Sequence, residues 1–327
     1  MKEIITVIGA GAWGTAIANL LATNDNEVCA ISDIKEICEE INQKNTHSIS
    51  LPEVNLEKNL RCSLDLKAEA IKSDLIYIVV PSNVVPIIIE QLSLVQLKEN
   101  CGFIICTKGL DHQSLKFFHQ ILEEKIPGHD VAILSGPNFA IEVAQKIPSV
   151  TDIASYNSDF AARVIKTLSN ENFKALPTDQ VLISEICAVV KNIIAIACGI
   201  NDGLQLGENS KAAIAVTGLS EIMQLARGLG AKNVDTQNAA GFGDIFLTCS
   251  TTKSRNNSLG NAIGQGEKYS ELKKKKTYEG AINAQSICKL AEQLGLDLKL
   301  CDFVKNTLEK EPSTTEIRAN LHQIICS

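Results

Sequence analysis

The sequence lacks the patterns that mark metal centres and disulfide frameworks. Its 11 cysteines are odd in number and scattered, with no Cys-x-x-Cys pair. Its five histidines form neither His-Glu-x-x-His nor any other spacing typical of metal ligands. We therefore predict no metal site, and we expect the cysteines to be reduced and mostly buried, where they act as small hydrophobic residues.

An excess of positive charge is also missing, since 31 Lys and Arg residues stand against 38 Asp and Glu residues, for a net charge of -7. This balance argues against nucleic acid or an anionic membrane surface as the main partner. The lysine run Lys273–Lys276 is better explained as a solvated loop. Because Lys2, Glu3 and a short apolar strand follow Met1 at once, we expect no signal or transit peptide and a cytoplasmic protein.

Length and composition indicate an ordinary globular protein with two domains, because the chain has 327 residues, of which 45% are hydrophobic and 21% charged. Short apolar strand patterns occur only before about residue 184, and helical patterns follow it. We place the domain boundary there, between residues 1–184 and 185–327, with no flexible linker, repeat or low-complexity tract.

The amino-terminal half alternates strand-like and helical segments. Apolar runs are typical of buried strands at Ile4–Ile8, Val28–Ile31, Leu75–Val80, Phe103–Cys106 and Val131–Leu134. This alternation predicts an α/β domain with a doubly wound parallel sheet. Ligands of such sheets bind beyond the carboxyl ends of the strands, where Lys108 places a positive charge. A surface lysine in a loop is the simpler interpretation of Lys108 taken alone.

The segment after the first strand, Gly9-Ala10-Gly11-Ala12-Trp13-Gly14, has the spacing of a dinucleotide fingerprint. Gly9 permits a tight turn, Gly11 lets a pyrophosphate approach the backbone, and Gly14 lets the helix and strand pack closely. The amino terminus of the following helix offers free N–H groups and a positive dipole end to phosphates. A glycine-rich turn without a ligand is the alternative interpretation.

Asp33 comes just after the second strand, about 20 residues past the glycines, where an acid accepts hydrogen bonds from the adenosine ribose. A carboxylate there also repels the 2′-phosphate of NADPH. A helical pattern follows, so the alternative is that Ser32 or Asp33 caps that helix.

Ile186–Cys198 is apolar except for Lys191 and Asn192, which predicts a helix buried on nearly every side. The run is shorter than a membrane span. A buried lysine is costly unless it is paired or deprotonated. The alternatives are therefore a catalytic Lys191 and a lysine whose stem extends to the surface.

The carboxyl-terminal half contains further helical patterns at 210–229, 258–264, 280–294, 302–310 and 314–325. Ala240–Asp244 interrupts them with a glycine-rich stretch that ends in an acid. Ser254 is expected to cap a helix with Arg255 in its first turn. Arginine there is unfavourable for the helix dipole unless an anion binds, so a phosphate site and a solvated arginine stay equal alternatives.

These segments occur in the order of a known family. The sequence resembles the NAD(P)-dependent glycerol-3-phosphate dehydrogenases of the bacterial type, from residue 4 to about residue 285. The matching stretches include GAGAWGTAIANLLA, SGPNFAIEVA, AVVKNIIAIACGI and AAGFGDIFLTCSTTKSRNNSLG. The resemblance implies a Rossmann domain and an all-helical domain with the active site in the cleft between them. It also implies a homodimer that interconverts dihydroxyacetone phosphate and sn-glycerol 3-phosphate for phospholipid synthesis.

The family's functional positions fall on residues of both halves. Its general acid/base lysine falls on Lys191, and its substrate-contacting positions fall on Lys108, Gly136, Asp244, Ser254, Arg255 and Asn256. Its cofactor positions fall on Ala12, Trp13, Lys108, Asn138, Ala140, Arg255, Thr277 and Glu279. Many relatives carry basic residues at the positions of Asp33 and Ile34, so this chain departs from them in a way that favours NAD over NADP.

The resemblance implies that Lys191 exchanges the proton of the substrate's C2 oxygen while hydride moves between C2 and the nicotinamide. Asp244 and Lys108 would assist as catalytic residues, Asp244 by fixing the direction of the ammonium group. Two rival functions are a 3-hydroxyacid or ketopantoate-type dehydrogenase and a dinucleotide-sensing protein without turnover.

Overall fold

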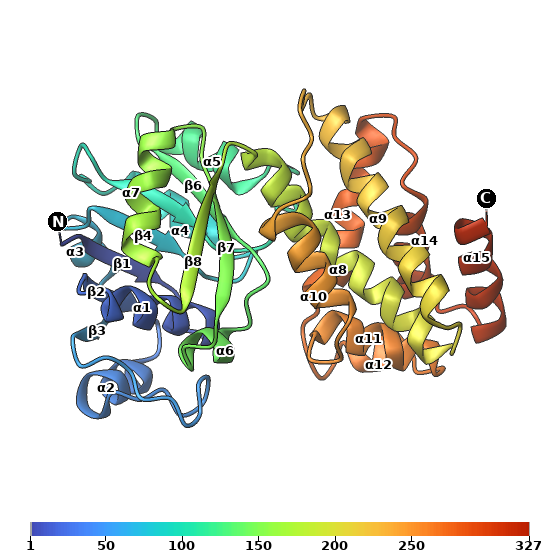
Figure 1. Ribbon diagram of the computed structural model, residues 1–327, viewed down its shortest axis with the longest axis horizontal. Helices are drawn as coiled ribbons and strands as arrows, with labels where there is room; N and C mark the ends of the chain where they lie inside the picture. The colour runs from blue at the N-terminus through green and yellow to red at the C-terminus, as the bar shows by residue number, and fades with distance from the viewer. Residues whose placement is uncertain (1, 327) are drawn as a thin grey trace. The chain divides into compact units, whose positions relative to one another are not determined.

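The computed structural model describes residues 2–326, which form two compact units. The first unit ends at Val181 and the second begins at Leu182, except that the short segment His112–Leu115 groups with the second. The first unit combines a sheet with helices, whereas the regular elements from Leu182 to Cys326 are all helical (Figure 1). This arrangement confirms the predicted fold class.

An eight-stranded sheet forms the centre of the first unit, in the order β3-β2-β1-β4-β5-β6-β7-β8. Its strands are β1 (Ile4–Ile8), β2 (Glu27–Ile31), β3 (Leu60–Ser63), β4 (Leu75–Ile78), β5 (Gly102–Ile105), β6 (Val131–Ser135), β7 (Ser149–Ala154) and β8 (Phe173–Thr178). All neighbours are parallel except β6 and β7. The order reverses direction beside β1, so the loops after β1 and β4 flank a topological switch point, where such sheets bind ligands.

Helices cover both faces of the sheet. Strand side chains alternate between two cores, with Ile5 and Val7 of β1 in one and Ile76 and Ile78 of β4 in the other. The first core is covered by α1 (Ala12–Thr23), α2 (Lys35–Lys44), α6 (Ala140–Ala144) and α7 (Ser158–Leu168). The second is covered by α3 (Leu66–Ala70), α4 (Val85–Ser93) and α5 (Phe118–Lys125). Burial on both faces explains why the central strands are continuously apolar.

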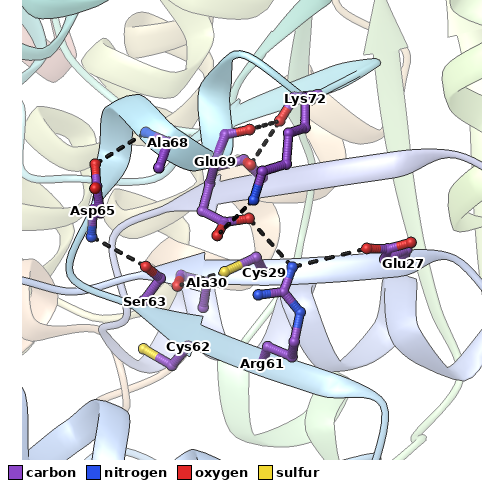
Figure 2. Close-up of polar contacts among 12 residues, drawn as sticks. Glu27, Cys29, Ala30, Arg61, Cys62, Ser63, Asp65, Ala68, Glu69 and Lys72 are labelled. Atoms are coloured by element: carbon purple, nitrogen blue, oxygen red, sulfur yellow. Dashed lines mark hydrogen bonds and ion pairs between the residues drawn. The ribbon is translucent and has the colours of Figure 1, made fainter.

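A charge cluster surrounds Arg61 of β3, at one edge of the sheet. Arg61 Nη2 lies 3.2 Å from Glu69 Oε2 and 3.9 Å from Glu27 Oε1, and Lys72 Nζ lies 3.4 Å from Glu69 Oε1 (Figure 2). Burial works to raise the pKa of the Glu69 carboxyl, but the hydrogen bond and charge of Arg61 outweigh it, so the pKa lies below its ordinary value. Charged side chains on an edge strand also discourage pairing with other chains.

The second unit is assembled around one long helix, α8. Its elements are α8 (Val181–Gly203), α9 (Glu208–Gly228), the π-helix η1 (Ala239–Gly243), α10 (Asp244–Cys249), α11 (Arg255–Gly264), α12 (Tyr269–Leu272), α13 (Glu279–Gln293), α14 (Lys299–Lys310) and α15 (Thr314–Cys326). By length and composition α8 could cross a membrane, but 94% of its most apolar window is buried inside the protein. The predicted central buried helix is therefore confirmed.

Glycines allow α8 and α11 to approach closely. Gly199 and Gly203 on α8 face α11, and a Cβ on either would overlap a main-chain carbonyl of that helix. Gly260 and Gly264 on α11 are in the reciprocal position against carbonyls of α8. Because the overlapping groups are backbone rather than flexible side chains, the crossing has no room to adapt. The spacing of these helices is thereby fixed.

Candidate active site

Lys191 lies in the middle of α8 and is 5% exposed. Its Nζ donates to Asp244 Oδ1 at 2.6 Å and to Thr248 Oγ1 at 3.0 Å. Both partners are buried, Asp244 at 1% exposure and Thr248 at 6%. A side chain that ends on two buried groups does not extend to solvent, so the snorkelling interpretation is wrong and the lysine is buried and paired.

Thr248 is a member of this cluster that sequence reasoning missed. Its Oγ1 donates to the main-chain oxygen of Asp244 at 2.6 Å and so presents a lone pair to Lys191. The only signal in the sequence is that Thr248 follows Asp244 by one helical turn, which places both side chains on the same face of α10. Two oxygen atoms from one helix thus fix the direction of the ammonium group.

The position of Asp244 depends on the unusual turn that precedes it. Asp244 is the first residue of α10 and follows directly on η1. The side chain of Asn238 caps η1 by accepting the N–H of Gly241 at 2.8 Å, and a Cβ at Gly241 would overlap the carbonyl of Thr236. Turns of the π type are rare and are frequent at functional sites. The glycine-rich stretch therefore serves to aim the acid at α8.

The start of α11 has the cap that the sequence predicts. Ser254 is the N-cap, and its hydroxyl accepts the N–H of Asn257 at 3.3 Å. Arg255 is exposed in the first turn and forms no ion pair with any residue between 2 and 326. Asn256 is buried, and its Oδ1 accepts the N–H of Gly280 at 3.1 Å. The bond leaves the amide NH₂ group of Asn256 as a donor.

Three helices of the second unit converge beside Lys191. A Cβ at Gly280, near the start of α13, would lie 2.6 Å from the carbonyl oxygen of Asn192 and 2.9 Å from Asn256 Oδ1. Asn192 is the neighbour of Lys191 on α8, and Glu279 is the neighbour of Gly280 on α13. The structure therefore brings together predicted residues from α8, α11 and α13. Thr277 is exposed and lies just before α13.

In the first unit, the glycine-rich loop has the geometry of a phosphate cradle. Gly9 follows β1 with φ of 110°, a left-handed value that favours glycine. A Cβ at Gly14 would overlap the main-chain oxygen of Gly9, whereas one at Gly11 would meet nothing within 4 Å. The helix α1 begins at Ala12, and no side chain caps it. Its first N–H groups are thus available, with Trp13 half-buried in the first turn, so the residues fit a dinucleotide.

Asp33 is exposed beyond the end of β2. The predicted alternative, in which Ser32 or Asp33 caps α2, is wrong, because the N-cap is Ile34 and no side-chain cap bond is made. Ser32 Oγ instead accepts the N–H of Ile34 at 3.1 Å, which tightens the turn two residues before the N-cap position. Within residues 2–326 the Asp33 carboxylate forms no hydrogen bond or ion pair, so it is available to a ligand.

The loops after β5 and β6 carry the other predicted residues of the first unit. Lys108 is half-buried, and Gly136 is buried. Asn138 Nδ2 donates to the main-chain oxygen of Val150 at 3.0 Å, which holds the loop against β7. Ala140 is the first residue of α6. All of these positions lie at carboxyl ends of sheet strands, as the parallel topology requires.

Comparison with known sequences covers nearly the whole chain. Residues 4–161 match the family described as NAD-dependent glycerol-3-phosphate dehydrogenase N-terminus, and residues 180–318 match the corresponding C-terminus family. A glycerol-3-phosphate dehydrogenase (NAD(P)+) of Erythrobacter litoralis is 35% identical over 311 residues, covering 94% of this chain and 92% of the relative. One from Parvibaculum lavamentivorans is 32% identical, covering 92% and 90%.

Solved structures agree with the sequence comparison. A glycerol-3-phosphate dehydrogenase from Coxiella burnetii superposes with a TM-score of 0.92 at 31% identity, covering 99% of both chains. A D-mandelate dehydrogenase reaches 0.64 at 16% identity, covering 99% of both chains, which shows a shared fold alone. The two family matches and the relatives above 30% identity lead to one conclusion: the chain belongs to the family of NAD-dependent glycerol-3-phosphate dehydrogenases.

Proposed function

We propose that the protein interconverts dihydroxyacetone phosphate and sn-glycerol 3-phosphate, with NAD(P)H as the hydride donor. The observation that carries the proposal is the buried cluster of Lys191, Asp244 and Thr248 in a chain of this family. Reduction of a ketone needs one hydride and one proton, and a bound nicotinamide supplies the hydride. The protein must therefore supply the proton and hold the substrate.

Lys191 is the proposed proton donor in the direction of reduction and the proton acceptor in the reverse direction. Its ammonium group is held by Asp244 Oδ1 and Thr248 Oγ1, which use two of its three N–H bonds. We propose that this ammonium group, with its direction fixed by the two oxygens, gives its proton to the C2 oxygen of the substrate. Proton transfer from a positioned side chain contributes about 10² to 10⁴ in rate. Lys108 is the second cation of the proposed catalytic set, along with Asp244.

The start of α11 is the proposed phosphate site. Arg255 is exposed and unpaired among the described residues, so its planar fork is available for bidentate contact with phosphate. Asn256 offers its amide NH₂ group, and Ser254 fixes the helix amino terminus behind them. An anion there also meets the positive end of the helix dipole, which removes the penalty of an arginine in the first turn. Gly136 completes the proposed substrate contacts.

The cofactor site is proposed at the glycine-rich loop of the first unit. Gly9, Gly11 and Gly14 shape an open cradle, and Ala12 and Trp13 present N–H groups of α1 to the phosphates. Asp33 is placed to accept hydrogen bonds from the adenosine ribose. Lys108, Asn138, Ala140, Arg255, Thr277 and Glu279 complete the set that the family resemblance suggests. NAD is the preferred dinucleotide of this proposal, and NADP is the secondary one.

The two parts of the chain have different proposed roles. Residues 1–184 form the proposed dinucleotide-binding part, and residues 185–327 the substrate and catalytic part. We further propose a cytoplasmic homodimer whose product serves phospholipid synthesis. Sedimentation of the purified protein tests the dimer, because a monomer has half the expected mass.

The activity is tested by NADH oxidation with dihydroxyacetone phosphate, with dihydroxyacetone and ketopantoate as matched substrates. We expect turnover with the phosphate ester and at most weak turnover with the other two. Faster oxidation with ketopantoate would favour the rival dehydrogenase, and NADH binding without turnover of any substrate would favour a dinucleotide sensor.

A further inference from the structure

A buried histidine contacts the glycine-rich loop from its buried side. His47 lies in the loop after α2 and is 0% exposed. Its Nε2 lies 2.9 Å from the main-chain oxygen of Ala10, the residue between Gly9 and Gly11. Among residues 2–326 its other ring nitrogen, Nδ1, is buried and has no hydrogen-bond partner. A fully buried imidazole that makes one hydrogen bond, and makes it to this loop, calls for an explanation.

The chemistry of the contact fixes which atom donates. A carbonyl oxygen only accepts, so Nε2 must carry the proton and donate it to Ala10. The peptide between Ala10 and Gly11 is planar and trans, so its C=O and its N–H point in opposite directions. Because His47 holds the C=O, the N–H of Gly11 is directed away from the protein interior. That N–H makes no hydrogen bond within the described chain, and the space at Gly11 is open.

The loop that carries His47 is itself held firmly. Glu40 on α2 accepts the Thr46 hydroxyl at 2.9 Å, the Ser48 N–H at 2.7 Å and the Ser48 hydroxyl at 3.1 Å, so it ties down both neighbours of the histidine. The His47 carbonyl accepts the N–H of Leu51 at 2.9 Å. The hydrogen bonds that Glu40 accepts from Ser48 and Thr46, with the Ser48 N–H first, lower the pKa of the Glu40 carboxyl.

We propose that His47 is a positioning residue for dinucleotide binding, which holds the Ala10–Gly11 peptide so that the Gly11 N–H is directed at the pyrophosphate before the ligand arrives. The inference rests on the proposed cofactor site. Without the donor, the Ala10 carbonyl is buried and unsatisfied, and the peptide is free to turn. The cost falls on phosphate recognition rather than on proton transfer, which occurs in the other unit.

The test compares His47→Leu, which removes the donor, with His47→Gln, whose amide nitrogen reaches the position of Nε2. The dissociation constant for NADH is measured by quenching of Trp13, the single tryptophan of the chain. We expect His47→Leu to raise it about tenfold and His47→Gln to restore it to within about threefold. The KM for NADH follows the same pattern, while kcat at saturating NADH and the KM for dihydroxyacetone phosphate stay within about twofold.

Two controls separate positioning from general damage. His119→Leu removes another buried imidazole of the same unit, on α5, and should leave NADH affinity unchanged. Adenosine has the ribose but no phosphate, so its inhibition constant should not differ between wild type and His47→Leu. Equal weakening of adenosine and NADH, or failure of His47→Gln to restore affinity, would show a structural role only and overturn the proposal.

A variant outside the core protects the test against misfolding. If His47→Leu does not fold, Glu40→Gln loosens the clamp on Thr46 and Ser48, and we expect a twofold to threefold rise in the NADH dissociation constant, on the order of a weakened hydrogen bond. Unchanged affinity in Glu40→Gln then refutes the proposal. NADH binding is measured without substrate, so a wild type that binds NADH but does not turn over refutes the proposed activity and leaves this inference standing.

Discussion

Replacement of Lys191 by methionine separates its role in catalysis from its role in packing. Methionine keeps most of the apolar stem that lies among the buried side chains of α8, but it removes the ammonium group. The loss of a positioned proton donor lowers turnover by a factor of about 10² or more. A hundredfold loss corresponds to about 2.7 kcal/mol of transition-state stabilisation. Dinucleotide affinity should be unchanged, because the glycine-rich loop lies in the other unit.

The same substitution should also destabilise the helical unit. Asp244 is 1% exposed and would lose its ion pair with Lys191, and breaking a buried ion pair costs about 3 to 5 kcal/mol. Thr248 Oγ1 lies 3.3 Å from Asp244 Oδ1 and can turn its proton to the carboxylate, so the lower end of that range is expected. The double variant Lys191→Met with Asp244→Asn removes both charges of this buried pair. It should recover most of the stability and none of the activity.

The assay combines steady-state kinetics with urea unfolding of the wild type and both variants. Turnover is measured at saturating NADH and dihydroxyacetone phosphate. A folded Lys191→Met protein with turnover within about threefold of wild type would refute the assignment of the proton donor. Recovery of activity in the double variant would refute it as well, because it would show that the single variant fails through instability alone.

Four further predictions concern other parts of the structure. Asp33→Arg should narrow or reverse a preference for NADH over NADPH that like-charge repulsion sets at about 1 to 3 kcal/mol, and comparable wild-type kcat/KM for both dinucleotides would contradict this. Arg255→Lys should raise the KM for dihydroxyacetone phosphate about tenfold because the bidentate fork is lost, and an unchanged KM would exclude the phosphate site. Gly260→Ala should push α11 away from α8, because the added Cβ overlaps a main-chain carbonyl of α8. We expect the free energy of unfolding to fall by about 1 to 3 kcal/mol and kcat to decrease. A variant as stable as wild type would show that the two helices can move apart without cost. Because Arg61 lowers the pKa of Glu69, the ion pair stabilises the fold fully above the ordinary carboxyl pKa of 4.5, and this stabilisation is lost as the pH falls toward the lowered pKa. The difference in unfolding free energy between wild type and Glu69→Gln, measured by urea unfolding, should therefore shrink from pH 7 to about pH 3.5.

The elements that could be predicted are those with a clear hydrophobic pattern, either buried on all sides or, as in α9, α13, α14 and α15, periodic over several helical turns. Five strands and α8 are continuous apolar runs, because both faces of each element are covered. The strands β3, β7 and β8 escaped prediction because charged or polar residues, and in β8 also a proline, interrupt their apolar runs. The strand β7 also runs antiparallel to β6. The helices α10 and α12 are too short to show a period.

In the candidate site, too, some residues could be predicted from the sequence and others could not. The isolated lysine in an apolar run predicts Lys191 as a candidate catalytic residue, and the glycine spacing predicts a phosphate-binding loop, because each pattern has a direct physical cause. The contact of Thr248 with Lys191 depends on the π-type turn at Ala239–Gly243, which no residue spacing indicates. The alternative role of Asp33 as a cap fails because α2 begins one residue later than that role requires. His47 is a lone histidine far in sequence from the loop that it contacts, so only the tertiary structure identifies it.

We propose that this chain moves hydride between a nicotinamide and C2 of a triose phosphate with Lys191 as the proton partner, and isotope labelling tests this directly. Dihydroxyacetone phosphate is incubated with NADH that carries deuterium at C4 of the nicotinamide on the transferred face, and the product is analysed by mass spectrometry. We expect sn-glycerol 3-phosphate with one deuterium at C2 from the wild type, and at least about a hundredfold less of it per unit time from Lys191→Met. Product without deuterium, or no product from a wild type that binds NADH, would contradict it.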